Sequence, residues 1–186
     1  MSILMSILMN ILITGSSGFL GKEVVAILNE NKFNLTFLGR SKIIKKNYIF
    51  CNLNNLKKLN LILDKLNPQA VINLAAEVNF IKNTKDMYKV NTYCPYIIAK
   101  FCKKNKTHFI HISGTIVNGI KKAYSKRTAF NPTNHYGKSK LQGDILITRT
   151  TAKATTRTNV PIVMTSATNV TMVMKMTMSM MMTMMT

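Results

Sequence analysis

Short apolar runs alternate with amphipathic segments along residues 10–148 of this 186-residue chain. The apolar runs predict buried strands at residues 10–14, 35–38, 48–51, 70–74 and 108–112. Between them, apolar residues recur at helical spacing and predict helices at residues 18–29, 53–66, 86–105 and 136–148, the third with a kink near Pro95. Strands that alternate with helices form βαβ units, so we expect an α/β fold with a doubly wound parallel sheet.

The pattern ends near residue 148. Residues 149–186 contain no Asp or Glu, are dominated by Thr and Met, and show no coherent period. We interpret them as a low-complexity tail that is disordered or read in a shifted frame, with a Met-rich interaction surface as the alternative. Residues 1–8 repeat Met-Ser-Ile-Leu and are interpreted as extra residues before the first strand, so the predicted domain spans residues 9–148.

The composition narrows the class of protein. The chain is 47% hydrophobic and 17% charged, which excludes wholesale disorder. A net charge of +20 would suit a nucleic-acid partner, but the lysines are scattered among abundant Asn and Ile, as AT-rich coding produces, so we do not expect one. The cysteines form no Cys-x-x-Cys pair, and we find neither a targeting signal nor a membrane-spanning run, so we expect a cytoplasmic protein with reduced thiols.

A glycine-rich loop joins the first predicted strand to the first predicted helix. It reads Thr14-Gly15-Ser16-Ser17-Gly18-Phe19-Leu20-Gly21. Gly15 suits a tight turn, Gly18 lets the backbone approach a pyrophosphate, and Gly21 allows close packing of helix on strand. The helix N-terminus adds N–H donors and the positive end of its dipole. The loop therefore predicts a dinucleotide site formed by Gly15, Ser17, Gly18, Phe19, Leu20 and Gly21.

The end of the second predicted strand bears on the choice of dinucleotide. A site that prefers NAD places a carboxylate about 20 residues past the glycines, where it binds the ribose hydroxyls. Gly39 occupies that position here, and Arg40 follows it. A guanidinium without a carboxylate suits a 2′-phosphate, so we expect NADP(H) in preference to NAD(H). The alternative is that Arg40 is simply solvated.

The last predicted helix begins with Tyr136-Gly137-Lys138-Ser139-Lys140. Residues four apart share one face of a helix. A tyrosine hydroxyl, with a pKa of about 10, is a weak acid or base at neutral pH, and a nearby ammonium lowers that pKa by stabilising the phenolate. Tyr136 is therefore the candidate proton donor or acceptor. Lys140 is the candidate activator and a ligand for the nicotinamide ribose.

Together these motifs resemble the extended short-chain dehydrogenase/reductase family over residues 9–147. The resemblance implies a Rossmann-type domain whose substrate domain is largely missing, because nothing after residue 148 resembles the family's C-terminal region. It also implies contacts around the cofactor and the active site from Asn52, Leu53, Ala75, Ala76 and Asn91.

The family also needs a hydroxyl just after the fifth strand, where it binds the substrate carbonyl. Aligned on the family pattern, this position falls on Gly114, which is a departure from the family. Ser113 or Thr115 could supply the hydroxyl after a local shift. Without it, catalysis would be weakened because the carbonyl loses a positioned donor.

The short link between residues 39 and 52 and the lead-in to Tyr136 are similar to dTDP-4-dehydrorhamnose reductases. This resemblance implies a sugar-nucleotide substrate and the NADPH-dependent reduction of a 4-keto-6-deoxy sugar. An NAD-dependent epimerase or dehydratase of sugar nucleotides stays open. A non-catalytic, cofactor-binding regulatory module, an inactive fragment and a homodimer also stay open.

Overall fold

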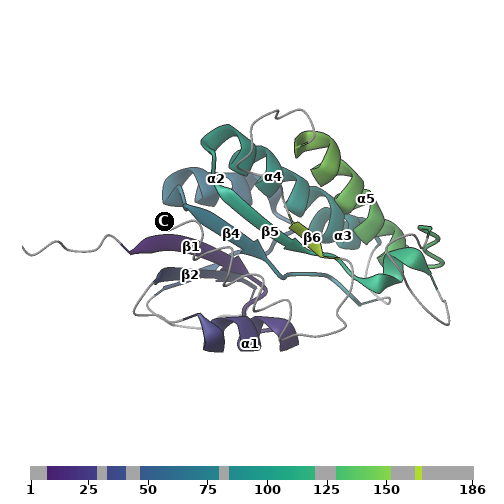
Figure 1. Cartoon of the computed structure of the whole chain (residues 1–186), viewed down its shortest axis with the longest axis horizontal. Coiled ribbons are helices and arrows are strands. Elements are labelled where there is room, and N and C mark those ends of the chain that lie inside the picture. Colours follow the sequence, from purple (N-terminus) through teal and green to yellow (C-terminus); the bar gives the residue numbers. More distant parts are fainter. Residues whose placement is uncertain are drawn as a thin grey trace, which may run out of the picture.

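The computed structural model describes residues 8–28, 33–40, 47–79, 84–119, 129–151 and 162–164. In this part of the chain, parallel strands form one sheet in the order β3-β2-β1-β4-β5-β6 (Figure 1). The strands are β1 (Met9–Thr14), β2 (Phe33–Gly39), β3 (Tyr48–Phe50), β4 (Ala70–Asn73), β5 (His108–Ile112) and β6 (Ile162–Met164). The chain winds outward from β1 in both directions, which confirms the predicted doubly wound sheet of Rossmann type.

Helices cover both faces of the sheet. Figure 1 shows α1 (Phe19–Ile27) on one face, and α2 (Leu56–Leu66), α4 (Cys94–Asn105) and α5 (His135–Thr151) on the other. The short α3 (Thr84–Tyr88) leads toward α4. The predicted helix 53–66 begins at residue 56 because Asn55 caps it, accepting a hydrogen bond from Lys58 N at 3.0 Å.

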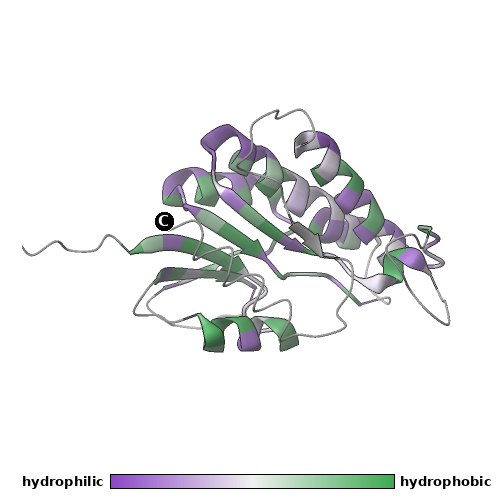
Figure 2. Cartoon of the chain, viewed as in Figure 1, coloured by the Kyte–Doolittle hydropathy of each residue, from purple (hydrophilic) through white to green (hydrophobic). Residues whose placement is uncertain are grey.

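The core explains why the strands read as continuous apolar runs. Successive side chains of a strand point to opposite faces. Accordingly, Ile11 and Ile13 of β1 join Val24 of α1 in one buried cluster, while Leu12 joins Ile98 of α4 in the other. A central parallel strand is covered on both faces and therefore has no polar side, as the hydrophobic colouring of the sheet in Figure 2 illustrates.

The strand register brings polar side chains together at one edge. Thr14, the last residue of β1, lies opposite Asn73 of β4, and Asn73 lies opposite His111 of β5. All three residues are buried. Because the strands are parallel, their carboxyl ends meet at this edge, where ligands bind in folds of this kind.

The segment predicted as helix 86–105 is helical but not uniformly α-helical. A π-helical turn, Lys89–Tyr93, separates α3 from α4. Pro95 occupies the first turn of α4, where its missing N–H costs nothing, and the irregular turn lies directly before α4. π-Helical turns inside α-helices occur frequently at functional sites.

The hydrophobic pattern predicts no element after residue 148, and the structure differs there. The helix α5 continues to Thr151, and β6 pairs with β5 so that Ile162 lies opposite Ile110. A strand of three residues is too short to give a periodic signal, which is why the pattern did not reveal it. Residues 1–7, 152–161 and 165–186 lie outside the described residues. Among the described helices, none has the length and apolar character needed to cross a bilayer.

Candidate functional site

The glycine loop makes a tight turn between β1 and α1. Gly15 has a φ of +73°, and a Cβ there would lie 2.6 Å from Ala75 N, so only glycine fits. A Cβ on Gly21 would overlap the Gly15 carbonyl oxygen. Gly18 N donates to Gly15 O at 3.0 Å, which closes the turn. These contacts draw the start of α1 close to the ends of β1 and β4.

The start of α1 is suited to an anion. Gly18 precedes the helix, no side chain caps its N-terminus, and the first turn holds no acidic residue. The first N–H groups of a helix lack partners within the helix and face the positive end of its dipole. Ser17, Gly18 and Phe19 are exposed, and Leu20 is half-buried. The predicted loop residues are thus together at a place where a pyrophosphate would fit.

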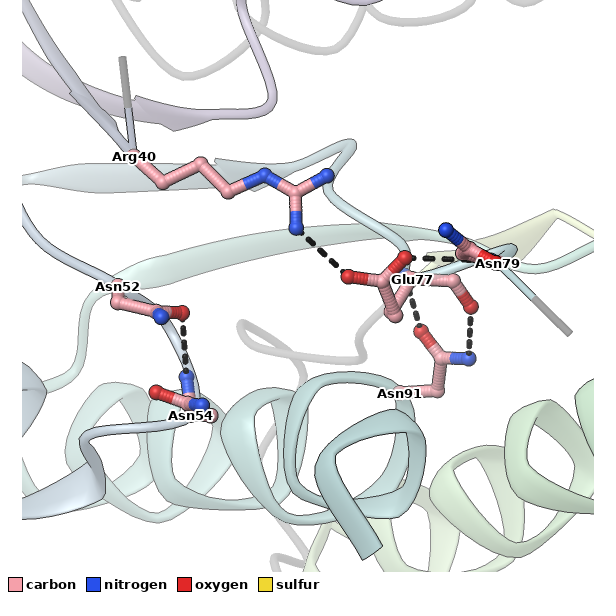
Figure 3. Close-up of polar contacts among 6 residues, drawn as sticks. All are labelled: Arg40, Asn52, Asn54, Glu77, Asn79 and Asn91. Carbon is pink, nitrogen blue, oxygen red and sulfur yellow. Dashed lines mark hydrogen bonds and ion pairs between the residues drawn. The ribbon is translucent and has the colours of Figure 1, made fainter. Parts of the chain in front are cut away.

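Arg40 follows β2 and reaches across the strand ends to a carboxylate that the sequence analysis did not single out. Its Nη1 lies 2.7 Å from Glu77 Oε2, with the Arg40 side chain 60% exposed and that of Glu77 8% exposed (Figure 3). The expectation of a guanidinium without a neighbouring carboxylate is therefore wrong. Glu77 is distant in sequence, so only the fold brings the two together. The exposed guanidinium keeps further N–H donors for a phosphate.

Asn91, from the π-helical turn, fixes the backbone at Glu77. Its Oδ1 accepts from Glu77 N and its Nδ2 donates to Glu77 O, both at 2.8 Å (Figure 3). The same Nδ2 lies 3.0 Å from Ser139 Oγ on α5. Asn91 is 2% exposed and thus ties the segment after β4 to the helix that carries Tyr136. The supporting role that the resemblance implied for Asn91 stays a prediction.

The other residues expected near the cofactor lie around the same edge. Asn52 follows β3, is exposed, and accepts from Asn54 N at 3.4 Å (Figure 3). Ala75 is half-buried beside the glycine loop, and Ala76 is exposed. Leu53 differs from these, because its side chain is 7% exposed and belongs to the core. Any ligand contact from Leu53 would therefore come from its backbone.

Tyr136 and Lys140 lie on the first turns of α5. Lys140 is 2% exposed, and its Nζ donates to the carbonyl of Ile112 at the end of β5 over 2.7 Å. Burial lowers the pKa of Lys140 to about 8, opposed by the nearby Asp144 and Cys94. Burial raises the pKa of the half-buried Tyr136. This direction is opposite to the one expected from the Tyr-Lys spacing, because Lys140 directs its ammonium at the backbone of β5.

The hydroxyl for the substrate carbonyl was expected in the segment after β5. Ser113 Oγ donates to Asp144 Oδ2 on α5. Gly114 is extended, with φ −165° and ψ 158°, and Thr115 opens a short 3₁₀ turn, Thr115–Asn118. The structure brings Ser113 and Thr115 to the strand end but leaves no hydroxyl at Gly114.

The strand order, the glycine loop and the helix with Tyr136 and Lys140 define a Rossmann-type protein of the extended short-chain dehydrogenase/reductase class. Within that class, residues 9–180 match the family described as the RmlD substrate binding domain, and the chain belongs to this family.

Individual relatives differ in their named activities. The chain is 27% identical to methionine adenosyltransferase 2 subunit beta of Danio rerio, over 75% of this chain and 43% of that protein. It is 28% identical to dTDP-glucose 4,6-dehydratase of Haemophilus influenzae, over 87% and 56% of the two chains. A hypothetical dTDP-4-dehydrorhamnose reductase from Sulfolobus tokodaii matches the structure with a TM-score of 0.66 and 29% identity, over 74% and 51%. The chain thus spans about half the length of these relatives.

Proposed function

We propose that this chain is the cofactor-binding part of an NADPH-dependent oxidoreductase that reduces a 4-keto-6-deoxy sugar nucleotide. The observation that carries the proposal is that the glycine loop, after β1, and the Tyr136–Lys140 turn of α5, beside the end of β5, lie at the same carboxyl edge of one parallel sheet. The likeness to the Sulfolobus tokodaii reductase supports the choice of substrate.

The residues present fit a nicotinamide dinucleotide. The uncapped start of α1 would hold the pyrophosphate. Lys140 is a buried ammonium with one hydrogen bond to Ile112 O, so its other N–H groups would serve the nicotinamide ribose. When bound, the nicotinamide supplies the hydride. Tyr136 would donate its hydroxyl proton to the substrate carbonyl oxygen as that oxygen becomes an alcohol.

Tyr136 would act as the proton donor in the reduction. Burial raises the pKa of its hydroxyl, which therefore carries its proton at neutral pH. Catalysis by an epimerase or dehydratase begins with the opposite step, in which a base removes a proton from the sugar. The likeness to the Haemophilus influenzae dehydratase favours that second reaction, and the two are distinguished by their products.

The replacement of Tyr136 by Phe tests the proton transfer. We expect Tyr136→Phe to lower kcat for NADPH oxidation with a dTDP-4-keto-6-deoxy sugar by about 10²–10⁴, the usual contribution of a general acid. Tyr93→Phe removes a hydroxyl from a tyrosine that is 43% exposed on the π-helical turn, and should leave kcat unchanged. Equal rates in Tyr136→Phe and the parent chain would remove Tyr136 from the mechanism.

The preference for NADPH rests on Arg40, which Glu77 holds over the strand ends. We expect Arg40→Ala to weaken NADPH binding about 10- to 100-fold, the loss of one charge-assisted hydrogen bond, with little change for NADH. Arg149→Ala, at the far end of α5, removes the same charge and is the control. Equal losses for both cofactors would contradict the assignment of Arg40 to the 2′-phosphate.

A regulatory module that binds cofactor without turnover is the second candidate. Two observations favour it: Gly114 offers no hydroxyl to the substrate, and the relatives include a subunit of methionine adenosyltransferase 2. Saturable NADPH binding without product from any 4-keto sugar nucleotide would favour the module over the reductase.

The remaining expectations concern the context of the domain. We propose that residues 9–148 form the cofactor domain and that the protein works in the cytoplasm. Cys51, Cys94 and Cys102 are free and buried, which suits a reducing compartment. A homodimer stays a proposal, to be checked by sedimentation of the purified chain.

A further inference from the structure

A chain of buried polar side chains crosses the sheet beside the proposed site. Thr14 Oγ1 donates to Asn73 Oδ1 at 2.5 Å, and Asn73 Nδ2 lies 2.9 Å from His111 Nδ1. His111 Nε2 lies 3.5 Å from Asp144 Oδ1, and Ser113 Oγ donates to Asp144 Oδ2. These polar contacts thus link β1 through β4 and β5 to α5.

The hydrogen bonds that link Thr14, Asn73 and His111 have one consistent direction. The Thr14 hydroxyl donates a hydrogen bond to the Asn73 side-chain oxygen. The amide nitrogen of Asn73 therefore faces His111 and donates to its Nδ1. His111 then carries its ring proton on Nε2 and is neutral, because burial lowers its pKa to about 4. That N–H faces Asp144.

Asp144 has one hydrogen-bond donor and one further neighbour. Ser113 Oγ donates to Oδ2, while Oδ1 makes no hydrogen bond with the described residues and lies 3.5 Å from His111 Nε2. A carboxylate suits both neighbours, since the proton of a carboxyl group would be directed at one of them. Asp144 is 7% exposed, so this charge requires a compensating cation nearby.

Lys140 is that cation. It lies one helical turn before Asp144 on α5 and is buried, with its ammonium on Ile112 O. The titratable groups that act on it are Asp144 on α5, Cys94 on α4 and His111 on β5. Asp144 and Cys94 favour its charged form, against the burial that lowers its pKa to about 8.

We propose that Asp144 is a positioning residue, whose carboxylate anchors α5 to the end of β5 through Ser113 and His111 and holds Lys140 as a cation for the cofactor ribose. The role of Lys140 rests on the proposed function. The anchoring also reassigns Ser113, because a hydroxyl that donates its proton to Asp144 does not donate it to a substrate carbonyl.

The test compares Asp144→Asn, which removes the charge and keeps the shape, with Asp144→Glu, which keeps the charge. In the full chain labelled with ¹³C-lysine, the Cε signal of Lys140, assigned with Lys140→Arg, reports its titration midpoint by NMR. We expect a lower midpoint in Asp144→Asn and a parent-like midpoint in Asp144→Glu. Asp86→Asn is the control, because Asp86 is an exposed acid paired with Lys89 at 3.4 Å.

Binding of NADPH as a function of pH supplies the second readout. Above the midpoint, each unit by which the midpoint falls makes the charged fraction of Lys140 about tenfold smaller. The affinity of Asp144→Asn for NADPH should therefore fall below that of the parent chain near pH 8, while Asp86→Asn follows the parent.

Two results would overturn the inference. One is a Lys140 midpoint in folded Asp144→Asn that equals that of the parent. The other, decisive if Asp144→Asn does not fold, is a lowered midpoint in Asp144→Glu despite its retained charge. The NMR reading needs neither cofactor nor substrate. An inactive parent chain would therefore defeat the proposed function and leave the assignment of Asp144 standing.

Discussion

The variant Gly114→Ser tests whether the missing hydroxyl limits the rate at which this chain reduces a sugar nucleotide. The backbone at Gly114 is extended, which any residue adopts. A Cβ there would have as its nearest neighbour Ile116 Cγ2, at 3.8 Å, which is ordinary van der Waals contact. The side chain therefore fits without movement of the backbone, and the hydroxyl is the main chemical change at the site.

The expected gain follows from the worth of one positioned donor. A hydrogen bond aimed at the oxygen that develops charge contributes about 10²–10³ in kcat, or about 3–4 kcal/mol. A side chain at an unstrained position also restricts the unfolded chain and stabilises the fold by about 0.4–1 kcal/mol. We thus expect Gly114→Ser to be faster by about 10² and slightly more stable than the parent chain.

The assay is kcat/KM for NADPH oxidation with a dTDP-4-keto-6-deoxy sugar, measured for the parent chain, Gly114→Ser and Gly114→Ala. The alanine variant adds the same Cβ without the hydroxyl and should share only the gain in stability. Equal rates in the serine and alanine variants would refute the assignment of the carbonyl donor to position 114. Turnover in none of the three chains, with NADPH still bound, would instead identify the regulatory module.

Two further predictions concern stability. Gly21→Ala should lower the free energy of unfolding in urea by about 1–3 kcal/mol, because the added Cβ overlaps the Gly15 carbonyl oxygen. Gly114→Ala is the control and should not destabilise the fold. Similar urea midpoints for the two variants would contradict the close packing of α1 on the loop. Burial lowers the pKa of His111 from 6.5 to about 4, so the unfolded chain binds the extra proton and stability should rise by about 3 kcal/mol between pH 4 and 6.5. His111→Asn should lack this rise, and an unchanged pH profile in that variant would assign the acid sensitivity to other groups.

The fold was predictable because its signals are local. Each central strand is an unbroken apolar run, as in Ile11, Leu12 and Ile13, since helices cover both faces of the sheet. The glycine loop was readable for the same reason, because the spacing of Gly15, Gly18 and Gly21 reflects one turn and the first turn of one helix. Local pattern and global packing agree in these segments.

The features that the sequence did not reveal depend on contacts between distant residues. Glu77 follows two alanines, and its sequence context indicates only a polar residue after a strand. It pairs with Arg40 because the fold brings the end of β2 close to the segment after β4. Asn91 was expected near the site from the family resemblance, but its contacts with Glu77 and Ser139 depend on a π-helical turn, and no spacing rule predicts such a turn. Asp144 was partly readable, since it lies four residues after Lys140 on a predicted helix face.

The Tyr-Lys pair shows how far a motif determines chemistry. The spacing fixes that Tyr136 and Lys140 share a face of α5, but the protonation of each group depends on what that face meets. Lys140 donates to the Ile112 carbonyl and lies one helical turn before the buried Asp144, whose charge opposes the lowering of its pKa by burial. Burial raises the pKa of Tyr136. The spacing alone therefore does not determine the protonation of either group in this chain.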